Sequence, residues 1–483
     1  MADKSPKTLK ENPPVAISLD HELSDAALLR KIDWRILPIM FLTYFLQFLD
    51  KVSLNYANVM GLQMDLDMHG NNFAWLATAF FIAYAVAEIP QGILLQRFPV
   101  TKVLGVNILC WGVLLSCSAA ATNYAGLMAL RVLLGVTEAV IAPALTIYTA
   151  MWYTREESTP RYGFWYCGLG AGQIIGGLIS FAAQRATPSG SGLHGWRAMF
   201  VAIGVVNVAI AGLVLFVLPS SPDTARFLSE AERARIAQRL SEDEAGRVGV
   251  GRKQSGWRSL AGALCDAQTW LLALLTVLVC VPSGVITTFS AVLIKGFGYT
   301  SEESALLNMP SGVVSIAATM VSTWAIARRY SRWLAIDLLL VPTLVGSCLM
   351  SFLSPSNQGG CLVGIYLVNS TVAPLALIFA WTGANYKDYT MRVSGCSLIS
   401  AAFSIANIIG PQTFQAADAP GYLPAKHTLV AVNAAGIVVS TALRVLYGVR
   451  NARASRMGMP AMGRIEGKLQ PDGSDQAGFR YVY

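Results

Sequence analysis

The chain has 483 residues, of which 54% are hydrophobic and only 13% are charged, whereas soluble proteins carry about 25% charged residues. So few charges cannot cover the surfaces of several soluble domains, and the composition therefore predicts an integral membrane protein. It argues against a disordered chain, a coiled coil, a secreted disulfide scaffold and a nucleic-acid-binding protein. The net charge of +8 fits the excess of Lys and Arg that membrane proteins keep in cytoplasmic loops.

The first 35 residues are polar and charged and contain no apolar core for a cleavable signal peptide, so we expect a cytoplasmic tail over 1–35. A membrane-spanning helix needs about 20 mostly apolar residues. Such stretches follow at 36–60, 73–95, 103–121, 124–148, 162–184 and 198–218. They predict an N-terminal six-helix bundle over 36–219.

A polar gap over 220–268 follows and holds eight basic and seven acidic residues. Ser229 and Glu232 have the spacing of a capping box, so we expect a surface helix in a cytoplasmic central loop that has no room for a catalytic domain. Further apolar stretches follow at 269–294, 304–327, 333–353, 361–382, 393–414 and 427–448. They predict a C-terminal six-helix bundle over 269–448 and a cytoplasmic tail over 449–483. The predicted fold class is therefore an all-α membrane protein with twelve transmembrane helices in two six-helix halves.

The basic residues of the short loops set the orientation, because cytoplasmic loops carry more Lys and Arg. If the N-terminus lies inside, nine such residues fall in cytoplasmic loops and four fall outside, so we expect both termini to be cytoplasmic. The nine are Arg97, Lys102, Arg155, Arg161, Arg328, Arg329, Arg332, Lys387 and Arg392, and the four are Arg185, Arg197, Lys295 and Lys426.

The two halves also repeat one another. Gln96–Phe98 and Arg328–Tyr330 lie 232 residues apart in equivalent loops, and the same offset leads from Arg155 to Lys387. Parallel six-helix halves related by a repeat are typical of major facilitator transporters.

Ionisable residues inside the membrane are candidates for function, because each costs at least about 2.5–3.5 kcal/mol there. All of those near mid-membrane depth fall in the first half, which is where we predict an ionic transport site. They are Asp50, Lys51, Glu88, Arg131 and Glu138. Pro90 follows Glu88 closely, and a helix kink with a satisfied carboxylate is the favoured account of Glu88.

Polar residues form a stripe along the first span. Tyr44, Gln47, Lys51, Asn55 and Asn58 are spaced three or four residues apart and share one face of a helix. Two interpretations remain open: a polar seam satisfied by neighbouring helices, or the lining of a water-filled cavity. The cavity is favoured, because keeping water away from a mid-membrane lysine and its four polar neighbours would be energetically costly.

Arg131 and Glu138 lie two turns apart on the fourth span, about 10 Å along the axis, so each needs a partner on another helix or in solvent. A structural charge network is the alternative to a transport role. Histidines occur only in the N-terminal tail, in loops and at span edges, so a coupled proton requires a carboxylate. Glu138 is favoured over Asp50, because Lys51 opposes protonation of the carboxylate beside it.

Enzyme motifs are missing. The glycine-rich stretch 168–177 lies inside a span and predicts close helix packing rather than a nucleotide loop. No GxSxG, HExxH or P-loop occurs, and the eight cysteines form no CxxC pair. We therefore expect neither an enzyme nor a metal or other cofactor.

Several segments resemble one transporter family across about residues 27–448. They are ALLRKIDWRILPIMFLTYFLQFLDK (27–51), LQRFPVTKVLG (95–105), RVLLGVTEAVIAP (131–143), WYTREESTPRYG (152–163), GWRAMF (195–200) and LPSSPDTARFLSEAER (218–233). They are similar to the fungal anion:cation symporters of the major facilitator superfamily. WYCGLGAGQIIGGLISF, PSGVITTFSA, LNMPSG and IIGPQTFQAADAPGY resemble its allantoate permease branch.

The resemblance implies roles for particular residues. Lys51 would contact an anionic substrate, and Arg131 belongs to the second acid–base pair of the family. Because Tyr44, Gln47 and Asn55 share the helix face of Lys51, we expect them to contact the substrate as well. Glu138 and Asp50 would take up the driving proton. Arg97, Lys102, Arg155 and Arg161 would belong to the cytoplasmic gating loops. Gln96 replaces the usual acidic residue of the first loop motif, and Gly172-Gln173 replaces the Gly-Pro of drug antiporters, which argues against drug antiport.

The sequence therefore predicts proton-coupled uptake of a small organic anion by alternating access, across a lipid bilayer that is expected to be the plasma membrane. Candidate cargoes are allantoate or ureido acids, nicotinate-like acids and other carboxylates. The alternatives are export of a carboxylated secondary metabolite and a nutrient sensor of the same fold. The oligomeric state stays open, with a monomer as the simplest expectation, and no nucleic acid is expected as a partner.

Overall fold

The computed structural model describes residues 25–186, 194–245, 261–262, 264–328, 330–354, 356–386, 389–419, 421–456 and 481–482. These residues form helices and connecting loops, with no β-strand among them. Lys387 and Arg329 of the predicted loop set lie outside this part of the chain, and the side chain of Arg155 does too.

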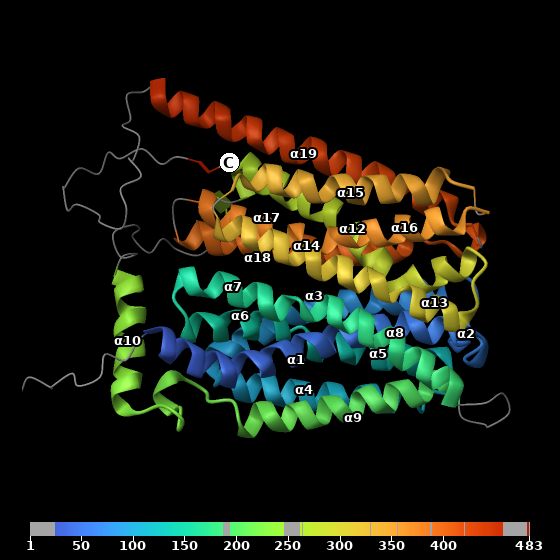
Figure 1. Cartoon of the computed structure of the whole chain (residues 1–483), viewed down its shortest axis with the longest axis horizontal. Helices are drawn as coiled ribbons and strands as arrows, with labels where there is room; N and C mark the ends of the chain where they lie inside the picture. The colour runs from blue at the N-terminus through green and yellow to red at the C-terminus, as the bar shows by residue number, and fades with distance from the viewer. Residues whose placement is uncertain are drawn as a thin grey trace, which may run out of the picture.

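The N-terminal half is built from α1 to α9, which lie together in the lower part of Figure 1. Their bounds are α1 Asp25–Val59, α2 Leu62–Asp65, α3 Asn72–Arg97, α4 Val100–Ser118, α5 Tyr124–Glu138, α6 Ile141–Trp152, α7 Arg155–Tyr166, α8 Gly168–Ala186 and α9 Gly195–Phe216. A short turn of 3-10 helix, η1 (Pro222–Thr224), and α10 (Glu230–Ala245) follow. α10 crosses one end of the bundle, which we call the α10 end.

The C-terminal half lies above it in the same view. Its bounds are α12 Ala267–Gly296, α13 Ser301–Leu307, α14 Met309–Ala327, α15 Arg332–Phe352, α16 Gln358–Val368, η2 Asn369–Val372, α17 Pro374–Asn385, α18 Tyr389–Gln412, η3 Ala416–Asp418 and α19 Leu423–Arg456. The halves meet where α1 packs on α12, α3 on α18, and α7 and α8 on α13 and α14.

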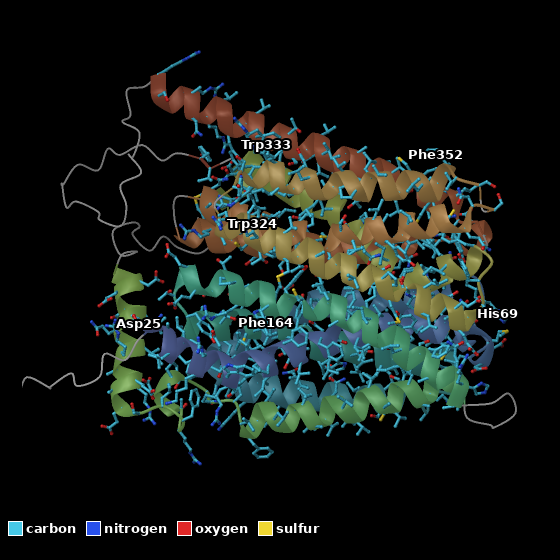
Figure 2. All side chains as sticks on the ribbon, in the orientation of Figure 1. Asp25, His69, Phe164, Trp324, Trp333 and Phe352 are labelled. Carbon is cyan, nitrogen blue, oxygen red and sulfur yellow. The ribbon has the colours of Figure 1, made fainter. Side chains whose placement is uncertain are left out.

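Twelve helical segments in the described ranges are long and apolar enough to cross a membrane. They confirm the predicted twelve-helix fold, and several of them are made of two shorter helices. Large apolar side chains such as Phe216, Leu338 and Val438 are exposed on the outside of the bundle, as lipid contact requires. Asp25 marks the α10 end and His69 the opposite end in Figure 2.

Both terminal spans are longer than predicted. α1 begins at Asp25, eleven residues before the predicted start at residue 36, and α19 continues to Arg456. These extensions are polar, so an apolar scan misses them. At the start of α1, Asp25, Lys31 and Asp33 bond to neighbouring elements at the α10 end.

The structure follows the sequence repeat closely. α4 begins at Val100 and α15 at Arg332, which is the 232-residue offset. The fourth span, predicted to be continuous, breaks directly after Glu138, and Pro143 explains the break because it cannot donate to the carbonyl of Ala139. Ser370, 232 residues after Glu138, lies in η2, where the tenth span also breaks.

The glycine-rich stretch of α8 packs helices closely, as expected. A Cβ placed on Gly170 would lie 2.3 Å from the carbonyl oxygen of Gly312 on α14, so only glycine allows this approach of the two halves.

Candidate functional site

Asp50 of α1 is the centre of a buried polar site. Its side chain is fully buried, and its Oδ2 accepts a 2.8 Å hydrogen bond from the indole Nε1 of Trp111 on α4. Arg131 Nη1 of α5 lies 3.6 Å from Asp50 Oδ1. Three helices therefore meet at one carboxylate, and Arg131 has the partner on another helix that its position demanded. Charge pairing and the indole donor together offset the cost of burying the Asp50 carboxylate.

Glu138 is placed differently, although it lies on the same helix as Arg131. It is the last residue of α5, it is fully buried, and neither carboxylate oxygen accepts a bond from an N–H or hydroxyl donor in the described structure. The Asp50 carboxylate lies close enough to share a proton with it. Asp50, Lys51 and Arg131 are the charged groups that act on it. An ionised carboxylate without donors is costly to bury, and binding a proton removes that cost.

Lys51 faces a group of aromatic rings from α3. Its Nζ lies 5.8 Å from the ring centres of Phe80 and Phe81 and 5.4 Å from that of Tyr84. Contacts of this kind stabilise an ammonium group without neutralising its charge. No carboxylate within the described ranges lies at ion-pair distance from Lys51, although Glu138 and Asp50 act on it from further away.

The remaining stripe residues fall into two groups. Tyr44 packs edge-on against Trp165 at 4.8 Å and stacks on Tyr166 at 5.4 Å. Gln47 Nε2 donates to the backbone oxygen of Glu138 at 3.3 Å. These contacts surround the buried charges. Towards the opposite end, Asn58 accepts a 2.6 Å bond from Gln63, which is a local contact.

Asn55 belongs to a polar cluster that joins the two halves. Its amide donates to Ser290 Oγ at 2.8 Å and accepts from the backbone N–H of Ala291 at 3.2 Å, both on α12. Asn308, between α13 and α14, donates to Ser290 Oγ at 3.0 Å and to Tyr56 OH at 3.1 Å. Both ends of the Asn55 amide therefore bond to the C-terminal half. This part of the stripe is a polar seam that a neighbouring helix satisfies, which was the first of the two interpretations of the sequence.

Aromatic rings reinforce this contact at the end opposite α10. Phe289 of α12 stacks on Phe414 at 4.7 Å and receives the edge of Phe73 of α3 at 5.4 Å. Tyr422 packs on Phe414 at 5.0 Å. The two halves are thus held together by apolar and polar contacts at this end.

Glu88 of α3 also reaches the other half. Its carboxylate accepts a hydrogen bond from Ser400 of α18, so the expectation of a satisfied carboxylate is met by a partner that the sequence did not indicate. α3 continues as one helix through Pro90 to Arg97.

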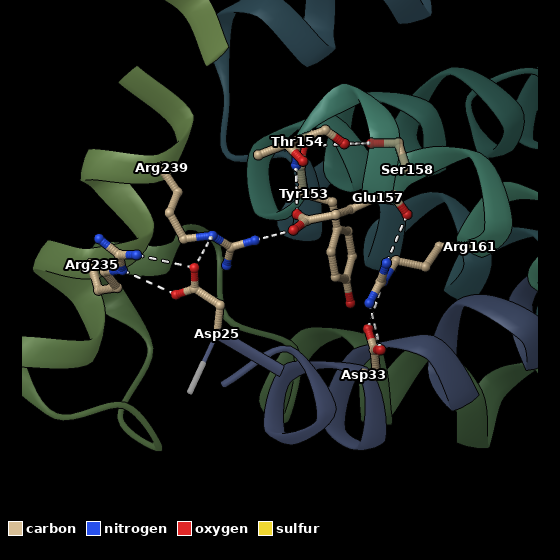
Figure 3. A network of polar contacts seen from close by, with 9 residues as sticks. All are labelled: Asp25, Asp33, Tyr153, Thr154, Glu157, Ser158, Arg161, Arg235 and Arg239. Atoms are coloured by element: carbon tan, nitrogen blue, oxygen red, sulfur yellow. Dashed lines mark hydrogen bonds and ion pairs between the residues drawn. The ribbon is translucent and has the colours of Figure 1, made fainter. Parts of the chain in front are cut away.

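The predicted loop residues differ in their surroundings. Arg161 binds Asp33 of α1 through two bonds of 2.7 and 2.8 Å, and its guanidinium lies 4.3 Å from the centre of the Tyr153 ring (Figure 3). Arg97 is the last residue of α3, Lys102 lies in the first turn of α4, and both side chains are exposed. They are therefore placed at the α10 end without an ion pair among the described residues.

The network in Figure 3 extends to α10. Arg235 holds the Asp25 carboxylate with two bonds of 3.0 Å, and Arg239 bonds to Glu157 of α7. Lys31 Nζ lies 2.8 Å from Glu232, whose capping box with Ser229 forms as the spacing predicted. Although burial opposes it, the bonds from Lys31 and Ser229 hold the pKa of Glu232 below its ordinary value.

Sequence reasoning missed several of these residues. Trp111, Ser290 and Ser400 lie in apolar spans and have no distinguishing pattern. Glu157 had a signal, because Thr154 precedes it with capping-box spacing, and that box is present at the start of α7.

Comparisons with known proteins agree with this architecture. The sequence profile of the Major Facilitator Superfamily matches residues 40–411. The allantoate permease of Saccharomyces cerevisiae is 33% identical over 445 residues, which cover 90% of this chain and 81% of the permease. The thiamine pathway transporter THI73 of the same yeast is 35% identical over 410 residues, covering 85% of this chain and 77% of that protein.

Among solved structures, the proton:xylose symporter XylE bound to 6-bromo-6-deoxy-D-glucose superposes with a TM-score of 0.67 over 86% of this chain and 95% of that chain. Its sequence identity is 14%, so it shows the shared fold alone. These relatives are transporters rather than enzymes, in agreement with the sequence. The chain therefore belongs to the major facilitator superfamily of membrane transporters and resembles its allantoate permease branch.

Proposed function

We propose that the protein is a secondary active transporter that carries a small organic anion together with a proton by alternating access. The observation that supports this most is the pair formed by Lys51 and Glu138. One is a cation without an ion-pair partner, and the other is a buried carboxylate without a hydrogen-bond donor, both within the described structure.

The anion would bind near Lys51. An anion that leaves water for the core of the membrane needs a cation and hydrogen-bond donors to replace its hydration. Gln47 and Tyr44 lie one and two turns from Lys51 on the same face of α1 and supply polar atoms on its side of the helix. The Tyr44, Trp165 and Tyr166 rings lie beside them and would suit a planar carboxylate or ureido group.

The proton would bind to Glu138 rather than to Asp50. Trp111 and Arg131 already satisfy Asp50 as an anion, whereas Glu138 gains from protonation whenever it is closed off from water. We propose that the loaded pair, anion on Lys51 and proton on Glu138, leaves the site without an unpaired charge, which is the condition for the halves to rock.

We also propose that the α10 end faces the cytoplasm and that the protein works in the plasma membrane. Arg97, Lys102 and Arg332 lie at helix ends on the α10 side, and Arg161 of α7 bonds there to Asp33 of α1. This fits the excess of basic residues on the cytoplasmic side of membrane proteins. With this orientation the contacts of Asn55 and Phe289 close the extracellular side.

Uptake measured in reconstituted vesicles tests this function. A panel of radiolabelled carboxylates is offered with and without an inward proton gradient, and we expect saturable accumulation of at least one of them that requires the gradient. Lys51→Gln should raise its apparent KM by about tenfold or more, the loss expected for removing one charged contact. Lys295→Gln, which changes an exposed lysine at the end of α12 that has no proposed role in transport, is the matched control and should transport normally.

Equal transport by Lys51→Gln and the wild type would contradict the anion site. Accumulation of no carboxylate, but of a cation or a neutral sugar, would contradict the substrate class. The same vesicles, preloaded and exposed to the inward proton gradient, distinguish the proposed symport from proton-driven export. An exporter that exchanges substrate for protons would empty them faster than vesicles without protein, whereas a symporter would retain the substrate.

A further inference from the structure

The C-terminal residues Tyr481 and Val482 lie against the α10 end of the C-terminal half, where Figure 1 marks the terminus beside α19. The backbone N–H of Val482 donates to Asn385 Oδ1 at 2.7 Å, and Asn385 Nδ2 donates back to the Val482 carbonyl at 3.0 Å. The indole Nε1 of Trp381 donates to the same carbonyl at 2.9 Å. Both of these side chains come from α17.

A second asparagine, Asn451 of α19, bonds to the backbone of the preceding residue, Tyr481, in the same way. The N–H of Tyr481 donates to Asn451 Oδ1 of α19 at 2.8 Å, and Asn451 Nδ2 donates to the Tyr481 carbonyl at 2.9 Å. Each side-chain amide therefore satisfies both backbone groups of one residue, as a neighbouring β-strand would. An extended segment held in this way is recognised by its backbone, whatever its sequence.

The Tyr481 side chain adds a specific contact. Its ring stacks on Tyr447 at 5.2 Å with 11° between the planes, and the Arg450 guanidinium lies 5.2 Å from its centre. Asp266, just before α12, fixes Arg450 through a 2.6 Å bond. An aromatic residue is thus favoured at the first position of the bound dipeptide.

The receiving groups are built into the protein interior. Trp381 and Tyr447 are fully buried, Asn385 is 1% exposed and Asn451 is 8% exposed. Removing the dipeptide would leave these buried polar groups without their hydrogen bonds. Because unpaired buried polar groups are costly, the occupied site is favoured.

We propose that α17, α19 and Asp266 form a peptide-binding cleft for an extended segment with an aromatic residue, and that the C-terminus of the chain occupies it. The occupied cleft joins the ends of α17 and α19 and, through Arg450, the start of α12. A competing peptide or partner segment with the same backbone pattern would displace the C-terminus.

Hydrogen exchange of the intact protein tests the cleft, read on the C-terminal fragment by mass spectrometry. Val482→Pro removes the backbone N–H that donates to Asn385 Oδ1, and it lies outside every helix. Val482→Ala keeps this N–H and its hydrogen bond. We expect the Tyr481 amide to exchange about tenfold faster or more in the Pro variant, and at the wild-type rate in the Ala variant.

Asn385→Ala and Asn451→Ala should have the same effect as Val482→Pro. Asn433→Ala is the matched control, because Asn433 is a buried asparagine of α19 that bonds to Ser347 and Leu429 instead of the terminus. An acetylated peptide with the sequence of residues 478–483, added in excess, should speed exchange of the chain's own terminus. Exchange that is equally fast in the wild type and in Val482→Pro, or unchanged by the peptide, would overturn the proposal.

Discussion

The two halves share one backbone plan and differ in chemistry. The 232-residue offset carries Asp50, Trp111 and Glu138 onto Pro282, Thr343 and Ser370. In the N-terminal half two of these positions hold carboxylates, and Trp111 bonds to one of them, Asp50. In the C-terminal half Thr343 bonds to Ser370 at 2.8 Å, and both residues are buried and neutral.

The difference shows how a repeated fold can divide its work. A helix break frees backbone groups and creates a place where a ligand can bind. Both halves break at equivalent points, but only the break after Glu138 carries a carboxylate. A neutral hydroxyl pair costs little to bury when its bonds are made, so the C-terminal half keeps its polar break without a charge to balance.

Making the N-terminal half neutral at its break should have the largest effect. Glu138→Gln imitates the protonated state permanently, and we expect it to abolish gradient-driven accumulation while exchange of labelled for unlabelled substrate continues. Ser370→Ala, the equivalent change in the other half, should still accumulate substrate. Accumulation by Glu138→Gln under an imposed pH gradient would assign the proton to another group, and Asp50 would be tested next.

Breaking the charge pair should have the next largest effect. Arg131→Met leaves Asp50 buried without its cation, so we expect the protein to lose about 3–5 kcal/mol of stability. Thermal unfolding in detergent measures the loss. The double variant Asp50→Asn with Arg131→Met should lose less than Arg131→Met alone, and a double variant that is less stable still would mean that the two charges do not act as a pair.

Trp111→Phe sharpens the comparison, because it removes the indole donor and keeps an aromatic ring. Loss of a hydrogen bond to a charged group should cost about 1.5–3 kcal/mol. Trp165→Phe is the control, since the Trp165 indole is buried but makes no hydrogen bond in the described structure. Equal losses in the two variants would attribute the effect to ring size rather than to the bond with Asp50.

The smallest effect on stability is expected from breaking the bond between Lys31 of the N-terminal half and Glu232 of α10. The pKa of Glu232 is lowered on folding, so its bond to Lys31 stabilises the protein above its ordinary pKa and the contribution is lost as the pH falls through the lowered value. For a partly exposed pair we expect about 0.2–1 kcal/mol. Glu232→Gln should flatten the acid limb of a stability profile between neutral and acidic pH, and an unchanged limb would refute the contribution.

The sequence was sufficient for the architecture because apolar length, loop charge and the repeat are local or additive signals. Twelve spans and their order follow from these, and the break after Glu138 could have been inferred from Pro143. Charge in a span marked Asp50, Arg131 and Glu138 as unusual. Their division into a bonded and an unbonded carboxylate depends on Trp111, which comes from another helix 61 residues away, and no periodicity records that contact.

The end of the polar stripe illustrates the same limit. Helical spacing placed Lys51 and Asn55 on one face of α1, and both do lie on that helix. Which part of that face meets the other half depends on how α12 and α14 pack. Serine and asparagine are common residues, so nothing in the sequence marks Ser290 and Asn308 as the partners. Within one stripe, Lys51 therefore contacts aromatic rings of its own half, whereas Asn55 bonds to the other half.

The attachments at the α10 end provide two fixed points for spectroscopy. α10 is bonded through Asp25, Lys31 and Glu157 to the N-terminal half, whereas Tyr481 and Val482 are bonded to the C-terminal half. A spin label or fluorophore on the exposed face of α10 and another beside the terminus would each move with its own half. The distance between the two labels would then report the rocking of the halves directly, with no label inside the membrane.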